Sequence, residues 1–90
     1  MDLLEIREHL DRLDKILILI LAERISLISK VAEYKKKENI MIYQQEREKA
    51  ILNNVVKLAE EQKLNPKLIE NIFELIIEDS HRIQKEVKGE

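Results

Sequence analysis

The sequence predicts an all-α fold in which each chain forms three helices, one long and two shorter, and two chains intertwine as a homodimeric bundle. Three observations support this prediction. The 90 residues include one glycine, one proline, two tyrosines and one phenylalanine, and 38% are charged, a composition that favours helices over sheets. Apolar residues recur at intervals of three and four. The longest helix that this spacing predicts is too long for one small domain to cover.

The first predicted helix runs from about residue 2 to residue 38. Its apolar residues keep the helical spacing up to the run of three lysines: Leu3, Ile6, Leu10, Leu13, Leu17, Ile20, Leu27, Val31 and Tyr34. At about 1.5 Å per residue, this helix is about 55 Å long, well beyond the breadth of a compact domain of this size.

The second predicted helix covers about residues 46–62, after a short connection at 39–43 in which Asn39 is a plausible helix terminator. Asn65 can cap a third helix, and Pro66 fits the first turn of that helix, where a missing N–H is no loss. This helix extends to about Lys88. Its apolar stripe consists of Ile69, Ile72, Phe73, Ile76, Ile77, Ile83 and Val87.

The two shorter helices can cover only part of the long one. We therefore expect residues 1–90 to form a single domain that pairs with a second copy, so that the two long helices share a core. A monomeric hairpin with a bent or broken long helix is the alternative. Residues 1–65 contain no proline or glycine that would bend the helix in this way.

Several classes of function find little support in the composition. Without cysteine the chain has neither disulfides nor thiolate ligands, and His9 and His81 are too far apart in sequence to form a motif, so we expect no metal and no cofactor. A net charge of −2, with acids and bases interleaved, argues against nucleic acid. The start of the chain lacks the pattern of a signal peptide, and the apolar run 16–22 is shorter than the roughly 20 residues of a membrane span. We expect a cytoplasmic protein with no membrane partner.

Polar residues occupy positions on the apolar stripes. Arg24 falls in the same row of the first helix as Leu10, Leu17 and Val31. Lys35 follows Arg24 by eleven residues, almost a whole number of turns, so the two cations point the same way about 16 Å apart.

The other two helices show the same feature. Glu48 lies three residues before Ile51 and opens the stripe of the second helix, while Ser80 and Gln84 extend the row of Ile76 in the third. Together with Arg24 and Lys35 they place polar groups on the inner side of every helix.

Each of these residues alone has an ordinary explanation. Arg24 can reach solvent or pair with Glu23, Glu48 or Asp14. Lys35 belongs to a lysine run that suits a helix C-terminus, and a glutamate near a helix start is favoured by the helix dipole. Because unpartnered buried charges are costly, the coincidence on three stripes favours a polar cavity inside a bundle. Two inward-facing cations indicate an anionic ligand.

The ordered set of these segments resembles the all-helical class of chorismate mutases over nearly the whole chain. The segments are Ile6-Arg7-Glu8, Leu13-Asp14, Leu21-Ala22-Glu23-Arg24, Lys35, Glu46-Arg47-Glu48, Ile76-Ile77-Glu78-Asp79-Ser80 and Gln84. The resemblance implies an isomerase that rearranges chorismate to prephenate, a step toward phenylalanine and tyrosine, without a cofactor. It also implies a homodimer with two active sites, each buried among helices of both subunits.

The resemblance assigns roles to four residues around the reacting bond. Arg24 and Arg7 resemble the arginines that hold the carboxylates of chorismate, with Arg7 reaching into the site of the other subunit. Their separation agrees, because seventeen residues of helix span about 25 Å, too far for both to hold one small molecule within one chain. Lys35 and Gln84 resemble the residues that contact the ether oxygen.

The remaining roles concern the ring of the substrate. Glu48 resembles the acceptor for the ring hydroxyl, with the Arg47 backbone nearby, and Ser80 resembles a further polar contact. Gln44 stands where the family often has an aspartate, and its amide can accept a hydrogen bond but carries no charge. His9 and His81 match no catalytic position, and we expect His81 to have a surface role.

Three other functions stay open at this point. Isochorismate pyruvate lyase uses the same scaffold and the same cations, although the retained Glu48 and the Glu78-Asp79-Ser80 segment favour the mutase. A coiled-coil dimerisation module would explain the long helix but not Arg24 or Gln84. A regulatory domain that has lost activity is the third, given Gln44.

Overall fold

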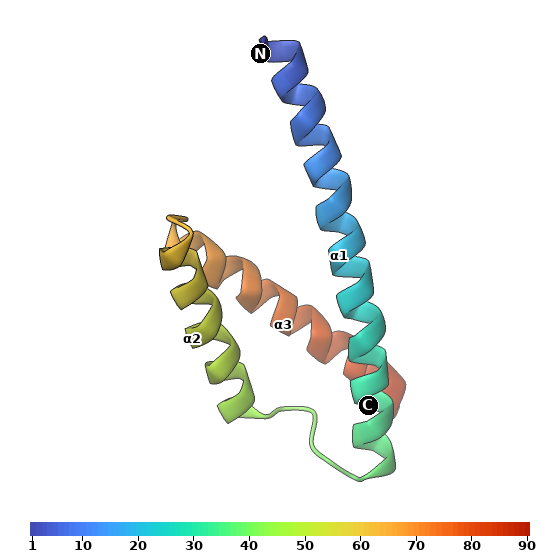
Figure 1. The fold of residues 1–90 in the computed structure, drawn as a ribbon. Coiled ribbons are helices and arrows are strands. Elements are labelled where there is room, and N and C mark those ends of the chain that lie inside the picture. Colours follow the sequence, from blue (N-terminus) through green and yellow to red (C-terminus); the bar gives the residue numbers. More distant parts are fainter.

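The computed structural model describes residues 1–90 as three helices without strands (Figure 1). These are α1 (Leu3–Lys37), α2 (Gln45–Glu61) and α3 (Pro66–Lys88). The predicted all-α fold is confirmed, and each predicted boundary lies within one residue of the observed one. The long helix is continuous, so the alternative with a bent or broken first helix is wrong.

The helix ends follow from local chemistry. Asn39 adopts the left-handed conformation, with φ of 58°, directly after the last turn of α1, a conformation that asparagine tolerates better than most residues. The side chain of Asn65 accepts hydrogen bonds from the backbone N–H groups of Lys67 and Leu68, and Pro66 occupies the first turn of α3. The predicted stop and restart between α2 and α3 is confirmed.

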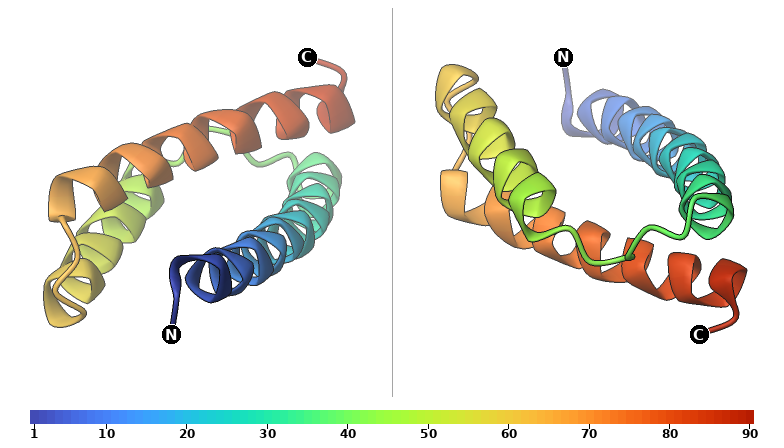
Figure 2. Two further views of the ribbon diagram at one scale, coloured as in Figure 1. Left: turned by 90° about the horizontal axis from the view of Figure 1, so that it is seen from above. Right: turned by 90° about the horizontal axis from the view of Figure 1, so that it is seen from below.

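The third helix links the other two. It packs against both α1 and α2, which make no packing contact with each other. The views from above and below show α3 crossing from α2 to the C-terminal part of α1 (Figure 2). The N-terminal half of α1 rises away from both (Figure 1).

This arrangement gives an extended molecule rather than a compact one. Its dimensions are 55 × 24 × 15 Å, and the longest of these agrees with the length expected for the first helix. The radius of gyration is 16.3 Å, whereas a compact chain of this size has about 12 Å. None of the three helices is both long and apolar enough to cross a membrane.

The core lies where α3 meets its two neighbours. Only 8 of the 90 residues are buried: Ala32, Ile42, Val55, Ala59, Ile77, Ser80, Ile83 and Gln84. Every residue from 1 to 20 is exposed, including the row of Leu3, Leu10 and Leu17, which are 59%, 52% and 57% exposed. The chain therefore leaves a long apolar face of α1 uncovered, as expected if a second copy covers it.

Candidate active site

A cavity of about 130 Å³ lies where the C-terminal part of α1, the connecting loop, α2 and α3 come together. It gathers every predicted site residue except Arg7. The lining residues are Arg24, Ile28, Val31, Lys35, Ile42, Gln44, Arg47, Glu48, Ile51, Ile77, Ser80, His81 and Gln84. Arg7 is exposed on the half of α1 that projects away from this cavity.

The ammonium group of Lys35 joins three parts of the chain. From the last turn of α1 it donates to the carbonyl of Ile42 in the loop and to Oε1 of Gln84 on α3, both at 2.8 Å. A lysine ammonium has three protons, so one stays available to a ligand. Gln84 is only 4% exposed, and because its oxygen accepts from Lys35, its amide nitrogen keeps its protons for the cavity.

The surroundings of Lys35 change its acidity. Partial burial lowers its pKa below the ordinary value of 10.5, because the charged form loses hydration. The negative charge of Glu48 opposes this shift, and the positive charge of Lys88 adds to it. Lys35 therefore releases its proton more readily than an exposed lysine.

Lys88 also holds the loop that precedes α2. Its Nζ donates to the carbonyl of Ile40 at 2.8 Å, and Lys36 reaches back from α1 to the carbonyl of Val87 at 3.4 Å. These contacts fix the loop against the end of α3, which places the Ile42 carbonyl on Lys35. Sequence reasoning missed Lys88, because a lysine near a helix C-terminus gives no signal beyond charge.

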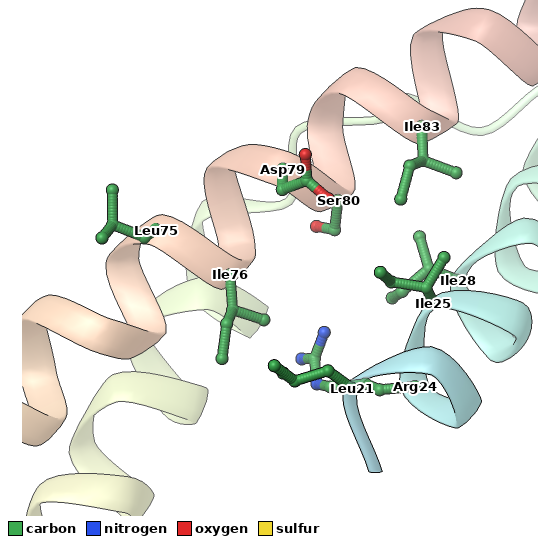
Figure 3. Close-up of a pocket in the computed structure, with 9 residues that line it drawn as sticks. All are labelled: Leu21, Arg24, Ile25, Ile28, Leu75, Ile76, Asp79, Ser80 and Ile83. Atoms are coloured by element: carbon green, nitrogen blue, oxygen red, sulfur yellow. The ribbon is translucent and has the colours of Figure 1, made fainter. Parts of the chain in front are cut away.

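Arg24 has no ion-pair partner. It lines both the cavity and an adjoining groove of about 210 Å³ between α1 and α3. Its guanidinium lies in the space between the two helices, near apolar side chains such as Leu21 and Ile76 (Figure 3). The pairs with Glu23, Glu48 or Asp14 that would give Arg24 a structural role do not form. Its charge is thus available to an anion.

The expectation of a surface role for His81 is wrong. Its Nε2 lies 2.7 Å from Oε2 of Glu48, and the two side chains are 17% and 27% exposed. The imidazole also packs against the ring of Tyr43 in an edge-type contact, with centroids 4.5 Å apart. His81 lies outside the predicted apolar stripe of α3, but its contact with Glu48 places it against α2.

The remaining predicted residues differ in how much hydrogen-bonding capacity they keep. Ser80 is buried, and its hydroxyl donates to the carbonyl of Ile77 at 2.7 Å, so its oxygen is free to accept. Gln44 precedes α2, and its side chain does not cap that helix. Arg47 is exposed and takes part in no ion pair.

The cavity has an excess of positive charge. Arg24, Lys35 and Arg47 contribute cations, and Glu48 is the only carboxylate in its lining. It can bind a small organic anion while a lysine and an amide donate hydrogen bonds to a neutral oxygen of the ligand.

Comparisons with known proteins identify a matching family and several similar sequences. The profile of the family described as chorismate mutase type II matches residues 6–85. A chorismate mutase of Methanocaldococcus jannaschii is 37% identical over 84 residues, covering 93% of this chain and 85% of that protein. A bifunctional chorismate mutase/prephenate dehydratase of Buchnera aphidicola subsp. Schizaphis graminum is 38% identical over 86 residues, covering 96% of this chain.

The second relative is much longer than this chain, which spans only 22% of its length. A T-protein of Enterobacter agglomerans is 34% identical over 80 residues and is likewise covered over only 21% of its length. The similarity to these proteins thus concerns one part of each of them.

Replacing Arg24 with leucine is expected to stabilise the free chain by about 1 kcal/mol, because it removes an unpaired, half-buried cation from an apolar groove. Urea unfolding without ligand measures this change. Arg82→Leu is the matched control, since Arg82 is exposed and pairs with Asp79 and Glu86, and it is expected to bring no gain. A destabilised Arg24→Leu chain would indicate a structural role for the arginine.

Proposed function

This chain belongs to the chorismate mutase type II family, and we propose that it catalyses the rearrangement of chorismate to prephenate. The observation that carries the proposal is the pair of Lys35 and Gln84, joined at 2.8 Å, beside the unpaired Arg24 in one cavity. This pair presents one ammonium proton and an amide group to the same small volume. Such donors suit an anionic substrate whose ether oxygen gains charge during reaction.

The reaction is a unimolecular Claisen rearrangement, in which the ether C–O bond breaks as a new C–C bond forms. It requires no nucleophile, metal or proton transfer, so binding and electrostatics supply the catalysis. Arg24, and Arg7 of the partner subunit, would hold the substrate carboxylates in the compact conformer that places the reacting carbons together. Holding the reactive geometry removes part of the entropic barrier.

Lys35 and Gln84 would stabilise the transition state. Negative charge grows on the ether oxygen as its bond to the ring breaks, and donors already in place cost no reorganisation at that moment. The Ile42 carbonyl and the Gln84 amide oxygen hold the ammonium of Lys35 before substrate arrives. The preorganised geometry therefore belongs to the folded chain.

The other side of the cavity would recognise the ring. We assign the ring hydroxyl to Glu48, with Gln44 as a neutral second acceptor and Arg47 and Ser80 as further polar contacts. All four line the same cavity. Gln44 supplies no charge, so Glu48 carries the ionic part of this recognition.

The proposal includes a homodimer. Arg7 is exposed on the uncovered half of α1, whose apolar row a second copy would bury. Burying a fully exposed leucine contributes about 1.5 to 3 kcal/mol, and each of these half-exposed leucines would contribute about half of that, which favours association. A cytoplasmic location stays a prediction from the sequence. Prephenate, the proposed product, is the compound named in the second activity of the bifunctional relatives.

The direct test follows the loss of chorismate absorbance with purified protein. The wild-type chain is expected to consume chorismate, and Lys35→Ala and Gln84→Ala to lose about a hundredfold or more in turnover, because each removes a preorganised donor. Isochorismate serves as the second substrate. Near-normal turnover by Lys35→Ala would refute its role, and pyruvate release from isochorismate without prephenate formation would identify the lyase instead.

The pH dependence provides a second test. Because the pKa of Lys35 lies below 10.5 in the free enzyme, kcat/KM is expected to fall with rising pH before an ordinary lysine would titrate. A bound dianion raises that pKa, so kcat should persist to higher pH than kcat/KM. Lys35→Arg, whose cation does not titrate in this range, should lack this alkaline limb. A wild-type limb at or above 10.5 would contradict the account.

A further inference from the structure

His81 has no part in the proposed reaction, yet it makes one of the shortest polar contacts of the chain. The contact joins its Nε2 to Oε2 of Glu48 at 2.7 Å, across the interface between α3 and α2. An ionised carboxylate only accepts hydrogen bonds, so the imidazole must donate. The other oxygen of Glu48, Oε1, takes no part in this contact, and Glu48 lines the cavity.

The imidazole is itself held from the outside. The ring of Tyr43 meets it at 62°, and Lys85 places its Nζ 5.3 Å from the centre of the Tyr43 ring. His81 lines both the polar cavity and a surface pocket that contains Tyr43 and Lys85. It thus forms part of the wall between the cavity and solvent.

Glu48 needs such a partner because of the charges around it. It is the only carboxylate lining a cavity that also contains Arg24, Lys35 and Arg47, and it already interacts electrostatically with Lys35. A glutamate side chain has three rotatable bonds, so without a fixed partner Glu48 could turn toward one of these cations. The bond from His81 opposes that movement.

We propose that His81 is a positioning residue, which holds Oε2 of Glu48 so that Oε1 faces the ring hydroxyl of the substrate. The inference rests on the proposed function and adds a determinant of substrate recognition to it. Because Gln44 supplies no charge, the orientation of Glu48 decides how well the hydroxyl is recognised. The hydroxyl contact exists before and during the reaction, so its loss affects binding rather than the chemical step.

The central comparison uses two variants of His81. His81→Leu removes the donor and keeps an apolar side chain, and is expected to raise KM for chorismate about tenfold while kcat changes by less than about threefold. His81→Gln, whose amide can donate to the carboxylate, is expected to recover most of the wild-type KM. Arg82→Gln, one position further along α3 and exposed, is the control and should match the wild type.

A chorismate analogue with hydrogen in place of the ring hydroxyl separates positioning from general damage. Wild type and His81→Leu should turn over this analogue with equal kcat/KM, since the contact that His81 supports is missing from both. In a Glu48→Gln background, His81→Leu should cause no further loss of kcat/KM for chorismate, because residues that act through one another are not additive. Thermal unfolding of each variant verifies that it is folded.

The result that would overturn the role of His81 differs from the result that would overturn the proposed function. An active wild type together with a His81→Leu variant that has unchanged KM, or loses as much on the analogue as on chorismate, overturns the role of His81. A wild type that does not consume chorismate overturns the proposed function. If His81→Leu fails to fold, His81→Asn takes its place in the comparison. The asparagine side chain is too short to reach Glu48, so His81→Asn should raise KM, whereas His81→Gln should not.

Discussion

The length of α1 is the constraint on which the rest of the structure depends. Its 35 residues form one unbroken helix, but α3 contacts only part of it and α2 contacts none. An apolar row that includes Leu10 and Leu17 therefore remains exposed. A second copy of the chain would bury this row. It would also bring its own Arg7 near the cavity of the first copy, which the Arg7 of the first copy cannot reach. Pairing of two copies along α1 would then both stabilise the fold and complete the active site.

The polar cavity near the C-terminal end of α1 lowers the stability of the folded chain. Lys35 is partly desolvated, and Arg24 lies between α1 and α3 without a partner. Each cation loses part of its hydration on folding, and for Arg24 no carboxylate of the chain offsets this cost. Hydrogen bonds to backbone carbonyls hold the loop in place around them, with Lys35 joining it to α1 and Lys88 joining it to α3. An anionic substrate would supply the missing partner.

The helices and most of the cavity could be predicted from the sequence, for physical reasons that particular residues illustrate. Apolar spacing located the helices, and Asn39, Asn65 and Pro66 marked their ends through backbone preferences that act locally. Five cavity residues, Arg24, Lys35, Glu48, Ser80 and Gln84, stood out because polar groups on apolar stripes are costly to bury. Gln44 and Arg47 followed only from the resemblance to the chorismate mutases. His81 and Lys88 were missed because their contacts depend on how α3 crosses the chain. His81 meets a carboxylate of another helix and Lys88 a loop carbonyl, and neither contact leaves a pattern in the sequence.

The claim that each site takes Arg24 from one subunit and Arg7 from the other is tested most directly by mixing two inactive variants. Arg7→Ala and Arg24→Ala chains should each be nearly inactive alone. In an equal mixture with free exchange, half of the dimers are mixed and one of the two sites in each has both arginines, so about a quarter of wild-type activity should return. A mixture no more active than its components, or an Arg7→Ala chain as active as the wild type, would contradict a shared site.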